Sequence, residues 1–415
     1  MLFNLKSARS FIIIFSLGIA SGLPLALIIS TLKVLLLEQG FDIKTIGFFA
    51  LISLPYSLKF CYAPFIDSMK IPFLSDKIGQ RKSWILLMQI LLAIFIGFLG
   101  MSGVMGNLFF IAIFALMVAF FSASQDIVID GYRIELIEKD DQGLAASFYV
   151  YGYRIGMLIS GAGALALAEI FYWDVVYLIM SFCMISTIFV TLFAEETRKN
   201  FKHKESFAAW FSSYVIDPFV DFSKNHRWYL ILIFVVLFKL SDAFAGNLTL
   251  PFLREIGFTK LEIASIVKTF GLFATLLGVF CGGLLVKKFS IYNTLWIAVV
   301  MQMLSNLAFC YLAKVGYDPR ALYFVIFIEN FSGGIGDAVF IAYLSGLCNV
   351  AYSATQYALL VSCATFARSV LTAGSGIIVA DYGWYNFFVF SAILSIPSLF
   401  LLFFIKRPHQ KELSK

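Results

Sequence analysis

Charged side chains are scarce in this chain of 415 residues. Asp, Glu, Lys and Arg make up 13% of it, whereas about a quarter of a typical soluble domain is charged. Hydrophobic residues make up 61%, and the mean hydropathy is +0.90. The short segments of alternating hydrophobicity that a transmembrane β-barrel requires are also missing. We therefore expect an all-α polytopic membrane protein.

Histidine and cysteine are equally sparse. The three histidines (His203, His226 and His409) are scattered over a central polar segment and the C-terminal tail. No two cysteines form a CxxC pair or a zinc-like spacing, so we interpret them as small buried apolar residues. They are Cys61, Cys183, Cys281, Cys310, Cys348 and Cys363. No Gly-rich nucleotide loop is visible, and we expect neither an enzyme, nor a metal site, nor a bound cofactor.

The net charge of +6 is informative through its placement. The cations lie in short segments between apolar runs, which argues against a nucleic-acid partner and indicates membrane orientation. Most fall on one side, which places both termini in the cytoplasm of a bacterial inner-membrane protein. These cations are Lys6, Arg9, Lys70, Lys77, Arg81, Lys82, Arg133, Lys139, Arg198, Lys199, Lys202, Lys204, Lys224, Arg227, Lys287, Lys288, Lys406, Arg407, Lys411 and Lys415.

The first apolar run resembles a signal peptide, because Lys6 and Arg9 precede it and Ala20-Ser-Gly22 lies within it. It continues to about Leu37, which is too long for a cleaved segment, so we interpret it as an uncleaved first span. About twelve spans follow from hydropathy. They are 11–33, 44–66, 84–103, 107–130, 143–168, 174–194, 229–250, 261–286, 291–313, 320–346, 355–378 and 384–405.

The longest polar segment, 195–228, divides the spans into two sets of six. We therefore expect an N-terminal bundle at 1–194, a cytoplasmic linker at 195–228, and a C-terminal bundle with its tail at 229–415. Three matches in the same order suggest a duplicated unit. Glu38-Gln-Gly-Phe41 matches Glu255-Ile-Gly-Phe258, Asp126 matches Asp337, and the spacing of Gln142 and Arg154 equals that of Gln356 and Arg368.

The stretch Ser122–Arg133 carries two carboxylates inside an apolar run. On a helix, Ser122, Asp126, Asp130 and Arg133 share one face. A carboxylate at the centre of a membrane helix costs about 2.5–3.5 kcal/mol, so we expect this face to line a polar interior. Asp126 and Asp130 are our candidates for proton coupling. The alternative is that they only pair with Arg133 or Arg154 to hold helices together.

Other polar residues inside spans are candidate substrate contacts. The Arg154 guanidinium is suited to grip either a ligand carboxylate or Asp126. For Tyr149 the alternative is helix packing, and for Asp337 it is helix–helix pairing. The full set is Gln125, Tyr149, Arg154, Asp242, Asn247, Asp337, Gln356 and Arg368. Lys59 and Lys268 are also costly inside a membrane, unless they extend to its interface.

The loop between the second and third spans carries Asp67 and, further on, Gly79-Gln-Arg-Lys82. A carboxylate at the end of one span that pairs with loop cations could latch one conformation. We therefore propose Asp67, Gly79, Arg81 and Lys82 as a conformational latch. The alternative is that the cations only set membrane orientation.

Several motifs together resemble the AmpG muropeptide permeases, a branch of the major facilitator superfamily. They are Gly22-Leu-Pro-Leu-Ala26, Lys44-Thr-Ile-Gly47, Leu54–Phe60 with Ala63-Pro64 and Asp67, Ser124–Arg133, and Gly152–Met157. The likeness covers most of the N-terminal half and is looser afterwards, at Asp242 and Asp337. Gly131 departs from the family, which usually has Ala there.

The resemblance implies a pseudo-symmetric fold of six plus six helices with a substrate site near mid-membrane. It also implies proton-coupled import of GlcNAc-1,6-anhydro-MurNAc and its peptides, driven by the proton gradient. Another sugar, peptide or activated metabolite is the alternative cargo. A membrane enzyme or a receptor would need catalytic loop motifs or a soluble domain, and neither is visible. The expected partners are a small-molecule substrate and the bilayer, for a monomeric protein.

Overall fold

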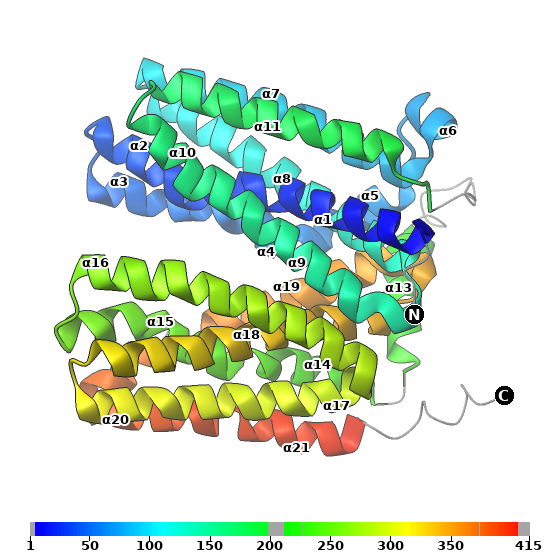
Figure 1. Cartoon of the computed structure of the whole chain (residues 1–415). Helices are drawn as coiled ribbons and strands as arrows, with labels where there is room; N and C mark the ends of the chain where they lie inside the picture. The colour runs from blue at the N-terminus through cyan, green and yellow to red at the C-terminus, as the bar shows by residue number, and fades with distance from the viewer. Residues whose placement is uncertain (1–4, 198–210, 226, 373, 406–415) are drawn as a thin grey trace. The chain divides into compact units, whose positions relative to one another are not determined.

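The computed structural model describes residues 5–197, 211–225, 227–372 and 374–405, which Figure 1 shows as coiled ribbons. Helices joined by short connections make up nearly all of this part of the chain, and no β-strand occurs within it. The expected all-α architecture is therefore confirmed.

The helices up to residue 193 carry both predicted carboxylates of the first half. They are α1 (Leu5–Ala26), η1 (Leu27–Thr31), α2 (Leu32–Glu38), α3 (Ile43–Phe48), η2 (Phe49–Ser53), α4 (Leu54–Ser57), α5 (Lys59–Ser68), α6 (Leu74–Ile78), α7 (Gln80–Met105), α8 (Leu108–Leu136), η3 (Lys139–Asp141), α9 (Gln142–Leu158), η4 (Ile159–Gly163), α10 (Ala164–Ala168) and α11 (Trp173–Phe193).

The remaining helices follow the polar segment. They are η5 (Ser212–Ile216), α13 (Asp217–Ser223), α14 (Trp228–Phe238), α15 (Leu240–Glu255), α16 (Lys260–Glu262), η6 (Ile263–Phe270), α17 (Gly271–Val315), α18 (Pro319–Leu347), η7 (Val350–Tyr352), α19 (Ser353–Thr372), α20 (Ser375–Ile393) and α21 (Ile396–Ile405).

Nine helical stretches of the described residues are long and apolar enough to cross a membrane. One of them, Ser265–Val315, is interrupted at Ser290, where the chain reverses direction between two rods (Figure 1). The stretch 43–68 is divided by short breaks, whereas 353–372 is the single helix α19, and neither is among the nine. With these divisions, the helices correspond to the stretches that hydropathy predicts.

The described residues form two compact units. Unit 1 comprises Met1–Glu138, Phe148–Phe219 and Cys348–Ser362, and unit 2 comprises Lys139–Ser147, Val220–Leu347 and Cys363–Lys415. Each unit therefore takes in one short segment from the other half of the sequence. The division of the chain into 1–194, 195–228 and 229–415 remains a prediction.

Unit 1 is built on α7, which packs against α8 and α11 (Figure 1). Its α1 and α9 touch backbone to backbone through two Gly-xxx-Gly pairs, Gly18 with Gly22 and Gly152 with Gly156. A methyl group at Gly22 would overlap the Tyr153 carbonyl oxygen. Small residues at four-residue spacing allow this approach, which is typical of membrane helices. The face of α9 that carries Tyr149 and Tyr153 is thereby fixed against α1.

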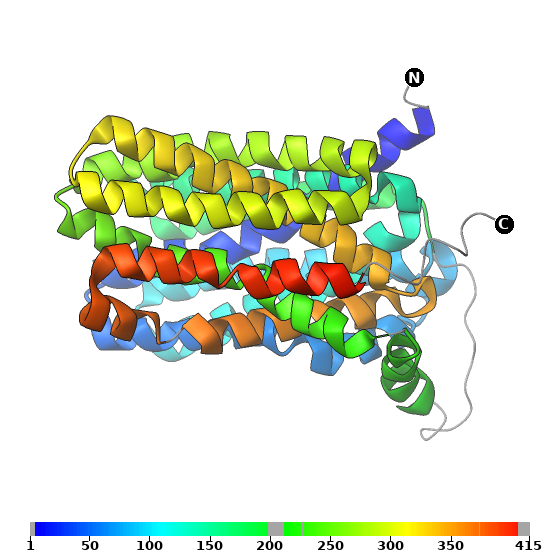
Figure 2. The ribbon, with the colours of Figure 1, turned by 90° about the horizontal axis from the view of Figure 1, so that it is seen from below.

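In unit 2, α17 packs along α18, and α20 packs against both α15 and α17. Figure 2 shows α20 and α21 end to end, in orange to red. Gly278 and Gly334 provide the close approach here, because a methyl group at either would overlap the facing backbone. The unit thus uses small residues in the same way as unit 1.

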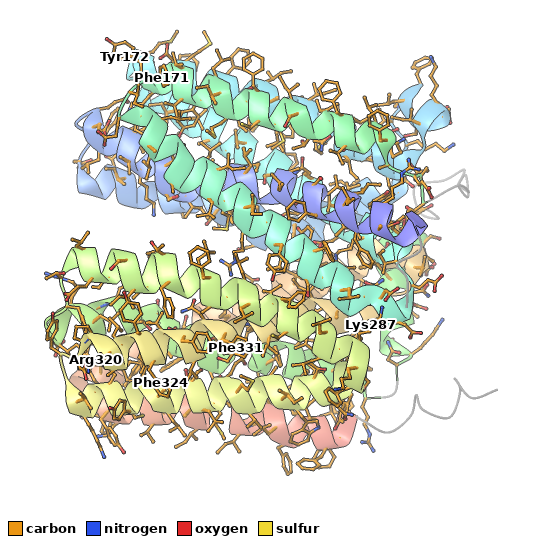
Figure 3. The ribbon with its side chains drawn as sticks, viewed as in Figure 1. Phe171, Tyr172, Lys287, Arg320, Phe324 and Phe331 are labelled. Carbon is orange, nitrogen blue, oxygen red and sulfur yellow. The ribbon has the colours of Figure 1, made fainter. Side chains whose placement is uncertain are left out.

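Aromatic side chains gather on exposed helix surfaces. Phe171 and Tyr172 lie exposed in the connection before α11, and Phe324 is exposed on α18 (Figure 3). Exposed apolar and aromatic side chains are expected on lipid-facing surfaces and at membrane interfaces. We therefore assign these rings to the bilayer rather than to a ligand.

The matched ends of the first and seventh spans have the same backbone conformation. Gly40 and Gly257 both have positive φ, of 81° and 105°. Phe41 N donates to Leu36 O at 3.1 Å, and the equivalent bond after Gly257, from Phe258, is 3.0 Å. Both helices thus end in the same glycine-dependent turn, which satisfies their last carbonyls. This agreement supports the internal repeat.

Candidate functional site

The two carboxylates of α8 are almost completely buried in unit 1. Asp126 is 7% exposed and Asp130 is 5% exposed, one helical turn apart. Oδ1 of Asp126 accepts no hydrogen bond from the described residues. A buried polar atom without a partner costs about 1–3 kcal/mol. Asp126 is therefore suited to bind a proton or to accept a hydrogen bond from a ligand.

Two cations balance these carboxylates. Lys59 begins α5 directly after the break at Leu58, is 6% exposed, and acts electrostatically on both Asp126 and Asp130. Arg133 lies 3.6 Å from Oδ1 of Asp130 along α8. The sequence alternative of an Asp130–Arg133 pair is thus present in the structure, whereas Oδ1 of Asp126 remains open.

Aromatic rings enclose the guanidinium of Arg133. It lies 5.6 Å from the centre of the Tyr149 ring and 5.4 Å from that of Tyr357. Such cation–π contacts contribute about 0.5–2 kcal/mol each. Tyr149 is 7% exposed, with the Tyr153 ring centre 6.1 Å away. Both rings of α9 therefore form the wall beside the two carboxylates.

Two other predicted contacts of unit 1 differ in their surroundings. Gln125 is fully buried, and its Nε2 donates to the Ala20 carbonyl at 2.9 Å, which ties α8 to α1. Arg154 is half-buried on α9. Gln125 thus has a clear packing role, while Arg154 keeps partial exposure.

The Gln356 and Arg368 side chains do not belong to one unit. Gln356 lies in unit 1, where its Nε2 donates to the Pro218 carbonyl at 3.0 Å and its Oε1 accepts from the Asn349 N–H at 2.7 Å. Arg368 lies further along α19, in unit 2, and is half-buried. The matched spacing in the sequence therefore does not bring these two side chains into one cluster.

Unit 2 contains a second charged cluster, at the break between α14 and α15. Lys239 occupies the break, and its Nζ lies 2.8 Å from Oδ1 of Asp337 and 3.3 Å from Oδ2 of Asp242. Each unit thus places one lysine near two aspartates: Lys59 lies near Asp126 and Asp130, and Lys239 lies near Asp242 and Asp337. The match between Asp126 and Asp337 extends to their surroundings.

Asn247 lies apart from this cluster. Its side chain is exposed, and Nδ2 donates to Ser375 Oγ at 2.9 Å. Glu329, on α18, is half-buried and acts electrostatically with Asp242 and Lys268. Unit 2 therefore brings Asp242 and Asp337 together and leaves Asn247 on a different surface.

The four latch residues meet at one end of α7. The Arg81 guanidinium donates to Asp67 Oδ1 at 2.8 Å, and both side chains are at most 2% exposed. Gly79 has a φ of +91°, and Lys82 Nζ donates to the Leu192 carbonyl at 3.0 Å. The expected pairing of the Asp67 carboxylate with a loop cation is thus present, and its role as a latch remains a prediction.

Three partners of this ion pair are absent from the sequence-based list. Glu135 accepts from Arg81 Nη2 at 2.6 Å, and Ser353 Oγ donates to Glu135 at 2.8 Å. Thr355 donates to Asp67 Oδ2 from its backbone N–H and its hydroxyl, at 3.2 and 3.0 Å. Asp67 therefore also caps the start of α19, where backbone N–H groups lack helical partners.

Glu196 was also missed. Its carboxylate accepts from the backbone N–H groups of Arg81 and Lys82, at 3.3 and 3.2 Å, and so caps the start of α7. A side chain at Gly79 would overlap this carboxylate. Two adjacent acids, Glu195 and Glu196, directly after an apolar span were the available signal in the sequence.

The model of the Major Facilitator Superfamily matches residues 10–370 and 240–415. The chain is 41% identical to a Rickettsia conorii protein named "Putative transporter AmpG 4", over 94% of this chain and 95% of that protein. It is 38% identical to the anhydromuropeptide permease of Escherichia coli K12, over 94% of this chain and 78% of the permease.

Solved structures agree on the fold. The proton:xylose symporter XylE matches with a TM-score of 0.72 at 12% identity, covering 96% of this chain and 95% of XylE. The human organic anion transporter MFSD10 matches with a TM-score of 0.72 at 15% identity, covering 96% of this chain and all of that chain (100%). The expected major-facilitator fold is confirmed, and the family consists of transporters rather than enzymes. The chain belongs to the AmpG-type permeases of the major facilitator superfamily.

Proposed function

We propose that this chain is a proton-coupled importer of GlcNAc-1,6-anhydro-MurNAc and its peptides in the bacterial inner membrane. The observation that carries the proposal is the 38% identity, over 94% of the chain, to the anhydromuropeptide permease. Such cargo consists of cell-wall fragments, which the importer would return to the cytoplasm for recycling. The placement of Lys and Arg in the sequence supports cytoplasmic termini.

Asp126 is the proposed proton carrier, with Asp130 as its partner. Burial and a neighbouring like charge both favour the protonated form of a carboxylate. Lys59 opposes this by favouring the charged form. The open Oδ1 of Asp126 supports this assignment, because Asp130 is already paired with Arg133.

Substrate contact is proposed for the half-buried Arg154 and for the rings of Tyr149 and Tyr153. A guanidinium matches a peptide carboxylate in a two-pronged fashion, and aromatic faces suit sugar rings. In unit 2, the exposed parts of Asp242 and Asp337, which also bind Lys239, would meet polar groups of the cargo. Gln125, Gln356 and Asn247 hold hydrogen bonds within the protein, so we assign them to the frame around the site.

The cluster of Asp67, Arg81, Glu135, Ser353 and Thr355 is the proposed latch. Its bonds join the end of α5 and the start of α7 to the start of α19. Conformational change in a transporter requires such bonds to form in one state and to break in another. Gly79 directly precedes α7 and Lys82 lies in its first turn, so both position the start of the helix that carries Arg81.

A different cargo is the second candidate. One strain of Rickettsia felis carries relatives named AmpG 4 and AmpG 1, which are 40% and 31% identical to this chain. Several copies in one organism favour a division of labour among substrates. A carrier of another sugar, peptide or activated metabolite would keep the same fold and the same carboxylates.

The test is uptake of radiolabelled GlcNAc-anhydro-MurNAc peptide into right-side-out membrane vesicles, with and without a protonophore. We expect uptake that collapses when the proton gradient is dissipated. Asp126→Asn should abolish accumulation, while Asp140→Asn, an exposed control, should leave it unchanged. Lack of uptake by folded, inserted protein would reject this cargo, and normal accumulation by Asp126→Asn would reject that residue as the coupling site.

A further inference from the structure

The Lys239 ammonium is surrounded by oxygen atoms in unit 2. Oδ1 of Asp337 lies at 2.8 Å, Oδ2 of Asp242 at 3.3 Å, and the Gly333 carbonyl oxygen at 3.3 Å. The lysine side chain is 12% exposed, less than the 25% and 29% of the two aspartates. Two carboxylates and one carbonyl offset the cost of removing the ammonium from water.

The location is a helix break. Lys239 has φ −98° and ψ 3°, and it separates the end of α14 from the start of α15. Interrupted helices supply ion sites in secondary transporters, because their free carbonyl groups and helix termini face a common point. Asp242 in the first turn of α15 is favoured there by the helix dipole. The surroundings of the ammonium therefore have the composition of a monovalent-cation site.

Gly336 of α18 leaves room for the lysine. A methyl group at Gly336 would overlap Gln302 Nε2 and lie 3.3 Å from Lys239 Nζ. A methyl group at Gly333 would lie 4.0 Å from Oδ2 of Asp242. The face of α18 beside Asp337 is thus open where the ammonium lies.

Gln302 is an independent observation at the same place. Its side chain is fully buried on α17, and neither its Oε1 nor its Nε2 has a hydrogen-bond partner among the described residues. The Gln302 amide and the Lys239 ammonium both border the point that a methyl group at Gly336 would occupy. The amide therefore lies beside the Lys239 cluster. Nε2 is the amide atom that borders this position, and a half-turn of the amide, which exchanges two atoms of nearly equal size, would turn Oε1 toward a cation there. A buried amide without a partner is costly, so a cation that binds the oxygen would offset that cost.

We propose that unit 2 contains a monovalent-cation site formed by Asp242, Asp337, the Gly333 carbonyl and Gln302, and that the Lys239 ammonium fills it permanently. Lys239 is then a tethered cation that holds the α14–α15 break against α18. The site needs no free Na⁺ in the native protein. Removal of the lysine side chain would expose a site for Na⁺ or a small alkylammonium ion. This inference does not depend on the cargo or on the proton coupling proposed above.

The test is thermal unfolding of purified full-length protein in buffers of choline, sodium or methylammonium chloride. For Lys239→Ala we expect a saturable rise in melting temperature of about 2–4 °C with sodium or methylammonium, but not with choline. The native protein and Lys288→Ala, which removes an exposed lysine of α17, should show no such rise. Asp337→Asn in the Lys239→Ala background should remove it.

Equal melting of Lys239→Ala in all three salts would overturn the proposal. If the variant does not fold in choline, the yield of monodisperse protein becomes the measurement. That yield should increase when membranes are solubilised in sodium or methylammonium, and an unchanged yield overturns the proposal as well. Neither measurement requires substrate or a proton gradient, so failure here is distinct from failure of the transport proposal.

Discussion

The Arg81 guanidinium and the Asp67 carboxylate form a 2.8 Å ion pair inside unit 1, and both side chains are at most 2% exposed. The same carboxylate caps α19 through Thr355, and the same guanidinium binds Glu135. Asp67 therefore serves as an ion-pair partner and as a helix cap at once. Its removal would leave Glu135 as the carboxylate that binds the Arg81 guanidinium and would take the acceptor from two donors of Thr355.

Asp67→Asn should destabilise the protein by about 1–3 kcal/mol, because it removes one of two carboxylates beside Arg81 and leaves buried donors short of an acceptor, while Glu135 still pairs with the guanidinium. Asp76→Asn is the matched control, because Asp76 pairs with Lys70 at 3.2 Å on the surface, where it is 69% exposed. Exposed pairs contribute about 0–1 kcal/mol. Thermal unfolding in detergent measures both, and equal melting temperatures for the two variants would contradict the buried role.

Gly22→Ala should prevent normal packing of α1 on α9. The new methyl group would overlap the Tyr153 carbonyl oxygen, and a backbone atom cannot move away without shifting the helix. Gly97→Ala on α7 is the control, because nothing lies within 4 Å of that position. Folded yield by size-exclusion chromatography should fall sharply for the first variant alone; full recovery of Gly22→Ala would reject this close contact.

Ser290→Gly should stabilise the protein by about 1–3 kcal/mol. Ser290 has φ 73° and ψ 158°, a region that only glycine occupies without strain. Gly79, which precedes α7 with φ 91° and ψ 169°, shows that glycine adopts the same conformation in this chain. Ser290→Ala keeps the strain and should give no gain. The melting temperatures of the two variants decide the matter, and an equal gain for both would point to a cause other than φ.

Asp42 should make stability depend on pH in the acidic range. The Thr45 side chain and its backbone N–H, at 3.0 Å, hold the pKa of the Asp42 carboxyl below its ordinary value. Its contribution is therefore present above the unfolded-state pKa and is lost as pH falls through the folded-state pKa.

The measurement is the melting temperature of the native protein and of Asp42→Ala as a function of pH. The difference between them should be present at neutral pH and shrink on acidification. Asp42→Asn keeps a hydrogen-bond acceptor but has no titrating group. The melting-temperature difference between Asp42→Asn and Asp42→Ala should therefore not change with pH in this range. A difference that stays constant with pH would exclude the carboxylate as its source.

Much of the fold could be predicted from local patterns in the sequence. Helical stretches follow from apolar runs, and the turns at Gly40 and Gly257 follow from a glycine after a helix end. Asp126 and Asp130 lie on the same face of α8 because they are four residues apart, a spacing that a helix places on one side. Such features depend on neighbours within one or two turns.

The partners of these residues could not be predicted in the same way. Thr355 meets Asp67 across 288 positions of sequence, and no periodicity specifies that contact. Lys239 is not among the candidates predicted from the sequence, because only the helix break brings its ammonium between Asp242 and Asp337. Polar contacts between distant segments depend on helix packing, and a single sequence does not encode that packing in a readable local form.

The placement of residues 139–147 in unit 2 and of 348–362 in unit 1 determines how the chain can be divided. A cut within 195–228 would give two fragments. The N-terminal fragment would carry residues 139–147, which belong to unit 2, and the C-terminal fragment would carry residues 348–362, which belong to unit 1. The C-terminal fragment would keep Ser353 and Thr355, while Glu135 and Asp67 stay on the N-terminal one. The two halves are therefore interleaved rather than modular. If either half were replaced by the corresponding half of a relative, residues 139–147 or 348–362 of the new half would also have to fit the unit formed mainly by the other half.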